Sequence, residues 1–168
     1  MSEEQSSPVS ELPAPEKPDR PCRELVLWFA YSQLDQRDPS PYWLDAYGQL
    51  PDVDTRAWCG VFDLWCLRQA GLTNWHWEAG KGFASRLHQT SEPQPGDVVY
   101  FDKPYQHHAL LVKVDGDLLH LIQGNYGAPG RVALSIVSRR QKRPLFYSIA
   151  QLLPKTRSAK PPQPAEAV

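Results

Sequence analysis

The chain has 168 residues, of which 41% are hydrophobic and 22% are charged, and these proportions suit one globular domain. The charges of its 18 basic and 19 acidic side chains nearly cancel, so the chain has no strong positive potential that would attract nucleic acid or an anionic membrane surface. No apolar run of the sequence is long enough to cross a bilayer. We therefore expect neither a nucleic-acid partner nor membrane insertion.

The 17 prolines are concentrated towards the two ends of the chain. There, apolar side chains are too sparse for their burial to offset the entropy lost on ordering. We expect a flexible Pro-rich head over residues 1–21, a single domain over residues 22–153 and a flexible Pro-rich tail over residues 154–168. The first residues are acidic and polar, unlike a secretory signal, so we expect synthesis in the cytoplasm without a signal peptide.

The first part of the predicted domain is expected to be helical. Residues 23–34 are densely apolar and predict a mostly buried helix, and a short helix is expected within residues 42–47. From residue 57 to residue 70 the apolar residues recur at helical spacing, and Gly71 can adopt the left-handed conformation that ends a helix. Residues 82–88 predict one more short helix.

The hydrophobic period changes after residue 96. Short branched or apolar runs follow one another, separated by turn residues, and such runs predict antiparallel strands. The predicted strands cover residues 97–101, 109–114, 118–122, 131–137 and 145–149. The fold class is therefore α+β, with N-terminal helices packed on an antiparallel sheet of about five strands.

The three cysteines differ in the roles that their positions indicate. Their spacing matches no paired Cys/His arrangement that binds zinc, so we expect no metal and no cofactor. Cys59 lies in the first turn of the predicted 57–70 helix, where unpaired N–H groups and the helix dipole lower a thiol pKa and favour a nucleophilic thiolate. Gly60 allows close approach of substrate beside it. The alternative, a buried cysteine acting as a small apolar side chain, is what we expect for Cys66, and Cys22 is expected to be incidental.

A nucleophilic thiolate needs a base and a group that orients the base. His107 and His108 stand where a loop enters a predicted strand, and because strand neighbours point to opposite faces, only one of them can reach Cys59. The next strand ends with two amides, Gln123 and Asn125, either of which could hold the imidazole tautomer. Packed or surface roles are expected for the other histidines, His76, His88 and His120.

Four segments in this order resemble the CHAP superfamily, the cysteine, histidine-dependent amidohydrolases and peptidases. Residues 58–62 (WCGVF) resemble its nucleophile helix, and residues 95–101 (PGDVVYF) resemble its first strand. Residues 107–112 (HHALLV) resemble its histidine strand, and residues 122–125 (IQGN) the strand that follows. The resemblance covers roughly residues 44–137, and the ordered set is far more specific than any one motif. The related cell-wall peptidases of the NlpC type share this core.

The resemblance implies a papain-like fold, with the cysteine helix packed on the histidine sheet, and a reaction that needs no metal. It makes Cys59 the nucleophile. The family pattern has a small residue two places after the histidine, and Ala109 satisfies this from His107, which makes His107 the base and His108 the alternative. The base would be oriented by Asn125, with Gln123 as the alternative, at a position where many members have a glutamate.

The resemblance also implies a substrate, the amide bonds of bacterial peptidoglycan, cleaved by an endopeptidase or amidase that contacts the peptide stem. Gly60 and nearby aromatic residues are expected to line the cleft: Trp58, Trp75, Trp77, Tyr105 and Tyr126.

Peptidoglycan lies outside the cytoplasm, so we expect export by a specialised route such as type VI secretion, as an antibacterial effector toxin acting in a target periplasm and blocked by a cognate immunity protein. The alternatives are a phage lysin, a cytoplasmic cysteine amidase or peptidase acting on a peptide conjugate or a protein, and a non-catalytic binding module.

Overall fold

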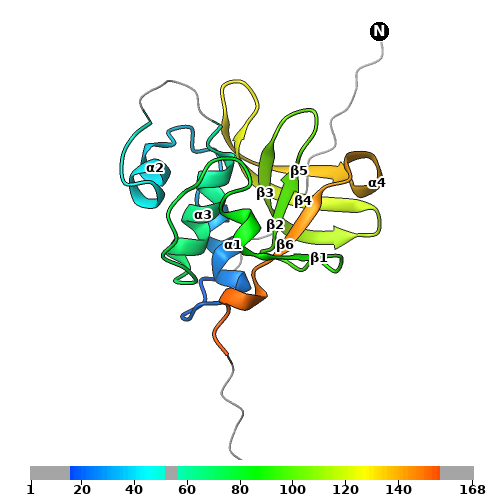
Figure 1. Ribbon diagram of the computed structural model, residues 1–168, viewed down its shortest axis with the longest axis horizontal. Helices are drawn as coiled ribbons and strands as arrows, with labels where there is room; N and C mark the ends of the chain where they lie inside the picture. The colour runs from blue at the N-terminus through cyan, green and yellow to red at the C-terminus, as the bar shows by residue number, and fades with distance from the viewer. Residues whose placement is uncertain (1–15, 52–56, 156–168) are drawn as a thin grey trace, which may run out of the picture.

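The structure, a computed structural model, describes residues 16–51 and 57–155. Within these residues the fold is α+β, with four α-helices and a six-stranded antiparallel sheet (Figure 1). The predicted fold class is therefore confirmed. Most of the predicted head and tail lie outside the described residues. Among the described helices, none combines the length and the apolar character that a membrane span requires.

Three helices form the layer that precedes the sheet in the chain. They are α1 (Arg23–Ser32), α2 (Ser40–Ala46) and α3 (Cys59–Gln69). Helix α2 begins two residues before its predicted start, because Asp38 Oδ1 accepts hydrogen bonds from the backbone N–H and the hydroxyl of Ser40. The helix expected within residues 82–88 is a single 3₁₀ turn, η1 (Ala84–Arg86).

The strands pair in the order β1-β6-β2-β3-β4-β5. Their bounds are β1 (His88–Thr90), β2 (Val98–Phe101), β3 (His107–Asp115), β4 (Leu118–Tyr126), β5 (Arg131–Ser138) and β6 (Leu145–Ser148). All five predicted strands are present. Strand β1 was not predicted, because its sequence His-Gln-Thr has no apolar alternation, and it is defined by its pairing with β6.

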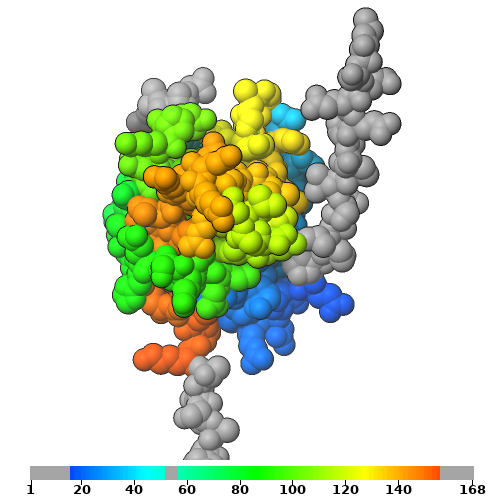
Figure 2. All heavy atoms as spheres, turned by 90° about the vertical axis from the view of Figure 1, so that its right-hand side faces the viewer, coloured from blue at the N-terminus to red at the C-terminus, as the bar shows by residue number. Residues whose placement is uncertain are grey.

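The connection between β5 and β6 contains a short helix, α4 (Arg139–Lys142). Asp117 in the β3–β4 turn binds the start of this helix, since its carboxylate accepts from Ser138 and from the Arg140 N–H. Figure 2 shows the two segments side by side on the surface, α4 in orange and the hairpin tip in yellow-green. The chain ends its described part with a second 3₁₀ turn, η2 (Ala150–Leu152).

Both faces of the sheet carry buried apolar side chains. The larger core lies between the sheet and helices α1, α2 and α3, and includes Leu110 of β3 and Ile122 of β4. A smaller core lies on the opposite face and includes Ala109 and Leu111 of β3. Successive residues of β3 therefore point alternately into the two cores, and this alternation decides which histidine faces the helices.

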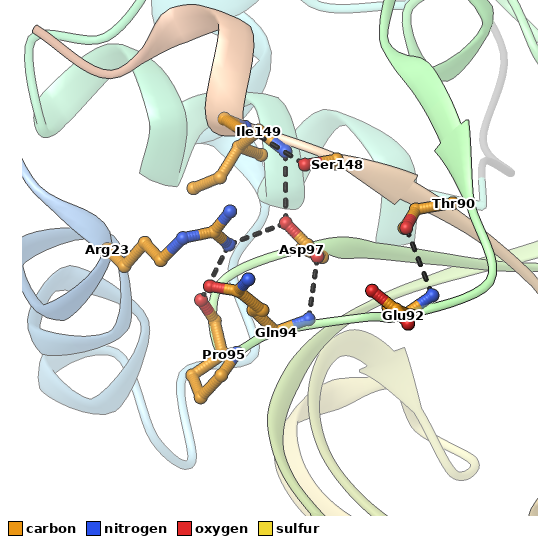
Figure 3. Close-up of polar contacts among 9 residues, drawn as sticks. Arg23, Thr90, Glu92, Gln94, Pro95, Asp97, Ser148 and Ile149 are labelled. Carbon is orange, nitrogen blue, oxygen red and sulfur yellow. Dashed lines mark hydrogen bonds and ion pairs between the residues drawn. The ribbon is translucent and has the colours of Figure 1, made fainter. Parts of the chain in front are cut away.

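Asp97 connects the first helix to the sheet (Figure 3). Its carboxylate, 1% exposed, lies 2.6 Å from an Arg23 guanidinium nitrogen and accepts from the backbone N–H groups of Gln94 and Ile149. Arg23 also donates to the Pro95 carbonyl oxygen. Because the buried charge is both paired and hydrogen-bonded, its desolvation is compensated. The site thus ties the start of α1 to the start of β2 and the end of β6.

Helix α3 lies against β3 and β4 at a point where the sheet has a glycine. A Cβ at Gly124 would lie 2.7 Å from the Trp58 ring and 2.8 Å from Phe62 Cβ, closer than real contacts allow. The absence of a side chain at Gly124 therefore lets the first turn of α3, which begins at Cys59, approach the sheet.

Candidate active site

Cys59 and His108 meet between helix α3 and the sheet. Cys59 is the first residue of α3, His108 is the second residue of β3, and the two are 49 positions apart in the chain. Cys59 Sγ lies 4.0 Å from His108 Nδ1. The thiol and the imidazole are therefore in hydrogen-bonding reach, which is the geometry that a nucleophile and its base require.

His107 lies on the other face of the sheet. Its Nε2 contacts Oε1 of Gln123, whose Nε2 donates to the hydroxyl of Ser135. The prediction that His107 faces Cys59 therefore disagrees with this geometry, and the alternative, His108, takes that place. The physical reason is the alternation along β3, which sends His107 into the smaller core with Ala109 and sends His108 towards the helices.

The two amides proposed to orient the base do not reach His108 either. Gln123 shares the face of His107, as its bond to that residue shows. Asn125 lies at an irregularity of the β4–β5 pairing, has a φ of 54°, and places its side chain against Gly130. Asn125 therefore does not orient His108: its side chain lies against Gly130, and no described residue hydrogen-bonds His108 Nε2.

Aromatic rings surround the imidazole of His108. Phe83 stacks on it at a centroid distance of 5.5 Å, and Tyr100 and Trp77 meet it edge-on at 5.0 and 5.8 Å. Burial among these rings lowers the pKa of His108 to about 3, helped by the charge of His107 and opposed by the Gly80 backbone. The imidazole is therefore neutral at neutral pH.

The thiol of Cys59 is also neutral in this structure. It is 2% exposed, and burial raises its pKa to about 11, with a further contribution from Asp63. Hydrogen bonds from the backbone of His108 in β3, and to a smaller extent from Gly60 and Cys59 at the start of α3, lower the pKa by less than burial raises it. The expected lowering of the pKa by the helix start is therefore outweighed, and the described state contains a neutral thiol beside a neutral imidazole.

The Trp77 ring lies against Gly60, next to Cys59, and beside His108. A Cβ at Gly60 would lie 2.3 Å from the Trp77 ring and 2.9 Å from His108 Nδ1, so the ring fills the space above Gly60. The Trp77 N–H donates to the Ala46 carbonyl oxygen at 2.7 Å, which holds this segment to the end of α2. The approach to Gly60 that was predicted for substrate is thus occupied by the indole, which substrate has to displace.

The other predicted cleft residues lie elsewhere. Trp58 is buried and stacks on Tyr42 at 5.7 Å, so it belongs to the core. Tyr105 is 74% exposed in the β2–β3 turn, and Tyr126 is exposed at the end of β4. The rings that do contact His108 include two that the sequence analysis did not select, Phe83 and Tyr100. Their apolar settings gave no signal that distinguished them from core residues.

The described cysteines, Cys22, Cys59 and Cys66, are all free. Over residues 16–51 and 57–155, no group of three or more His, Cys, Asp or Glu side chains is arranged to hold a metal ion.

A cysteine at a helix start, facing a histidine on an antiparallel sheet, is the arrangement of a papain-like cysteine hydrolase. Residues 51–125 match the family model described as CHAP domain, and this match is consistent with the papain-like amidase and peptidase superfamily. Such a domain suggests hydrolysis of amide bonds in peptidoglycan-like substrates. Comparison with the curated proteins and with the solved structures gave no match.

Burial of His108 predicts an acid-sensitive component of stability. Below pH 6.5, the ordinary histidine pKa, this imidazole is protonated in the unfolded chain, whereas in the folded chain it stays neutral until about pH 3. The contribution of neutral His108 to the free energy of unfolding is therefore complete above pH 6.5 and is lost as the pH falls. Between pH 7 and pH 5 we expect a loss of about 2 kcal/mol from this group, measured by denaturant unfolding. His108→Gln should lack this component, and the exposed His88→Gln should retain it. Equal pH dependence in wild type and His108→Gln would contradict the assignment.

The position of Trp77 predicts that the indole protects Cys59 from alkylation. Trp77→Ala should increase the rate of iodoacetamide labelling at Cys59 severalfold, because it exposes the thiol to water and so removes the cause of its raised pKa. Labelling is followed by mass spectrometry at each cysteine. Trp75→Ala, in the same segment, is the matched control, and fully buried Cys66 reports any global unfolding. An unchanged rate of iodoacetamide labelling at Cys59 in Trp77→Ala would show that the indole does not protect the thiol.

Proposed function

We propose that this protein is a cysteine hydrolase that cleaves amide bonds in bacterial peptidoglycan, with Cys59 as the nucleophile and His108 as the base. The observation that carries the proposal is the 4.0 Å approach of Cys59 Sγ to His108 Nδ1, inside the segment that matches the CHAP domain. The family match supports this class of substrate, and the distance supports the choice of the two reacting side chains.

The chemistry follows from the pair. His108 Nδ1 accepts the thiol proton of Cys59, and the thiolate sulfur attacks the carbonyl carbon of the scissile amide. Backbone N–H groups at the start of α3 donate to the oxyanion that forms. The imidazolium then donates its proton to the leaving amine, and water, deprotonated by His108, hydrolyses the thioester.

The resting protonation states fit a site that opens for substrate. The transfer from Cys59 to His108 creates two charges, which the buried environment disfavours, as the raised thiol pKa and the lowered imidazole pKa indicate. Displacement of Trp77 would bring the polar amide of the substrate and the oxyanion donors to the pair. Charge separation then becomes less costly when substrate is present.

Digestion of purified peptidoglycan tests the proposal and the choice of histidine. We expect wild type to release fragments, and we expect Cys59→Ala and His108→Ala to lower the rate by a factor of about 10² to 10⁴. His107→Ala, the neighbouring imidazole on the other face, should keep most of the activity. Fragment masses identify whether a peptide bond of the stem or cross-bridge, or the sugar–peptide amide, is cut.

Near-ultraviolet circular dichroism checks that each variant is folded. Loss of activity in folded His107→Ala with retention in folded His108→Ala would reverse the assignment of the base.

We also propose that the hydrolase is an antibacterial effector, delivered by a type VI or similar apparatus into a target periplasm, with a cognate immunity protein as partner. Support comes from the location of peptidoglycan outside the cytoplasm, where a hydrolase of this substrate has to act. Wild type fused to a periplasmic export signal should lyse the host, whereas the exported Cys59→Ala variant and cytoplasmic wild type should not. Harmless periplasmic expression of active wild type would count against this role.

A second candidate function is a module that binds wall fragments without cleaving them. Two observations favour it: Cys59 is buried with a raised pKa, and His108 Nε2 has no hydrogen-bond partner among the described residues. Binding to peptidoglycan without release of any fragment by wild type would select this candidate over the hydrolase.

A further inference from the structure

An aromatic hollow lies beside the Cys59–His108 pair. It has a volume of about 310 Å³ and is lined by Trp43, Tyr47, Pro51, Trp77 and Ala79. This volume is at the lower end of the range of about 300 to 1,000 Å³ that is typical of small-molecule sites. One of its walls, the Trp77 indole, is the ring that fills the space above Gly60 and meets His108 edge-on. The Trp77 ring therefore lines the hollow and also contacts the surroundings of the candidate catalytic pair.

The rings of the hollow are held at near right angles. Trp43 lies 5.9 Å from Tyr47 at an interplanar angle of 77° and 6.4 Å from Trp77 at 87°. Trp43 is in α2, and Tyr47 directly follows that helix. The backbone N–H of Trp77 donates to the Ala46 carbonyl oxygen, which holds the segment that carries the third ring to the same helix end. The arrangement is thus built by two segments that are bound to each other.

The lining favours one part of a peptidoglycan substrate over the other. The lining residues that the structure describes are aromatic residues, a proline and an alanine, and none of these carries a carboxylate, ammonium or guanidinium group that would pair with the charged groups of a stem peptide. A pyranose ring has an apolar face of C–H groups, which packs on the electron-rich face of an aromatic ring, while its hydroxyls remain in water. Tyr47 is 41% exposed, so a ring lying against it keeps one side open to solvent.

We propose that this hollow is a subsite for a sugar ring of the glycan strand. The inference rests on the proposed function and makes it more specific. Because the Trp77 ring also packs over Gly60, the neighbour of Cys59, a sugar held against this ring is near the reacting pair. The substrate then carries glycan as well as peptide, and the scissile amide is close to the sugar–peptide junction rather than in a distant cross-bridge.

Binding to the Cys59→Ala protein tests the subsite without turnover. The probes are a disaccharide–tetrapeptide released from peptidoglycan by a muramidase and the same tetrapeptide without sugar, measured by tryptophan fluorescence and calorimetry. We expect the sugar-containing probe to bind at least about tenfold more tightly. Adding Tyr47→Ala should abolish this preference, and adding Leu44→Ala, an exposed apolar residue of the same helix outside the hollow, should preserve it.

Equal affinity for the two probes, tighter binding of the free tetrapeptide, binding of neither probe, or a preference that survives Tyr47→Ala would each overturn the subsite. Because the assay needs no hydrolysis, it separates the two proposals. A sugar preference in a protein that cleaves no wall would retain the subsite and reject the hydrolase, and hydrolysis without a sugar preference would do the reverse.

Discussion

The close contact between helix α3 and the sheet is the constraint on which the candidate site depends. At Gly124 the sheet has no side chain, and the space that a Cβ would need is taken by Trp58 and Phe62 from the first turn of the helix. This contact sets the height of Cys59 above β3 and so its 4.0 Å distance from His108 Nδ1. Asp97 also holds the helical layer to the sheet, because it links the start of α1 to β2 and to the end of β6.

The same packing that brings the pair together also makes both members neutral. Burial raises the pKa of Cys59 to about 11 and lowers that of His108 to about 3, in each case against the charged form. The helix start would favour a thiolate in water, but desolvation is the larger effect here. The neutral pair lies beside Trp77, which packs over Gly60 and also lines the aromatic hollow proposed as a sugar subsite.

The adjacent histidines His107 and His108 contact different layers of the fold. His108 faces α3, whereas His107 joins Gln123 and Ser135 in a polar chain beside the smaller core. That chain links β3, β4 and β5, so it stabilises the register of the strand that carries His108. A substitution at His107 can therefore affect the site through the strand without touching the reacting atoms.

The sequence by itself determined much of this protein. The apolar periodicity located helix α3 and the five longer strands, the position of Cys59 before that periodic run placed the thiol at a helix start, and four ordered motifs indicated the family. These features are local, because each depends on residues a few positions apart. The tertiary structure decided the rest.

Which histidine faces the cysteine depends on the phase of β3, and residues 109–112 are all apolar, so no polar alternation revealed that phase. The protonation of Cys59 depends on its burial between α3 and the sheet, and β1 exists only through its pairing with β6. Each of these is set by groups that are distant in the chain and become neighbours only on folding.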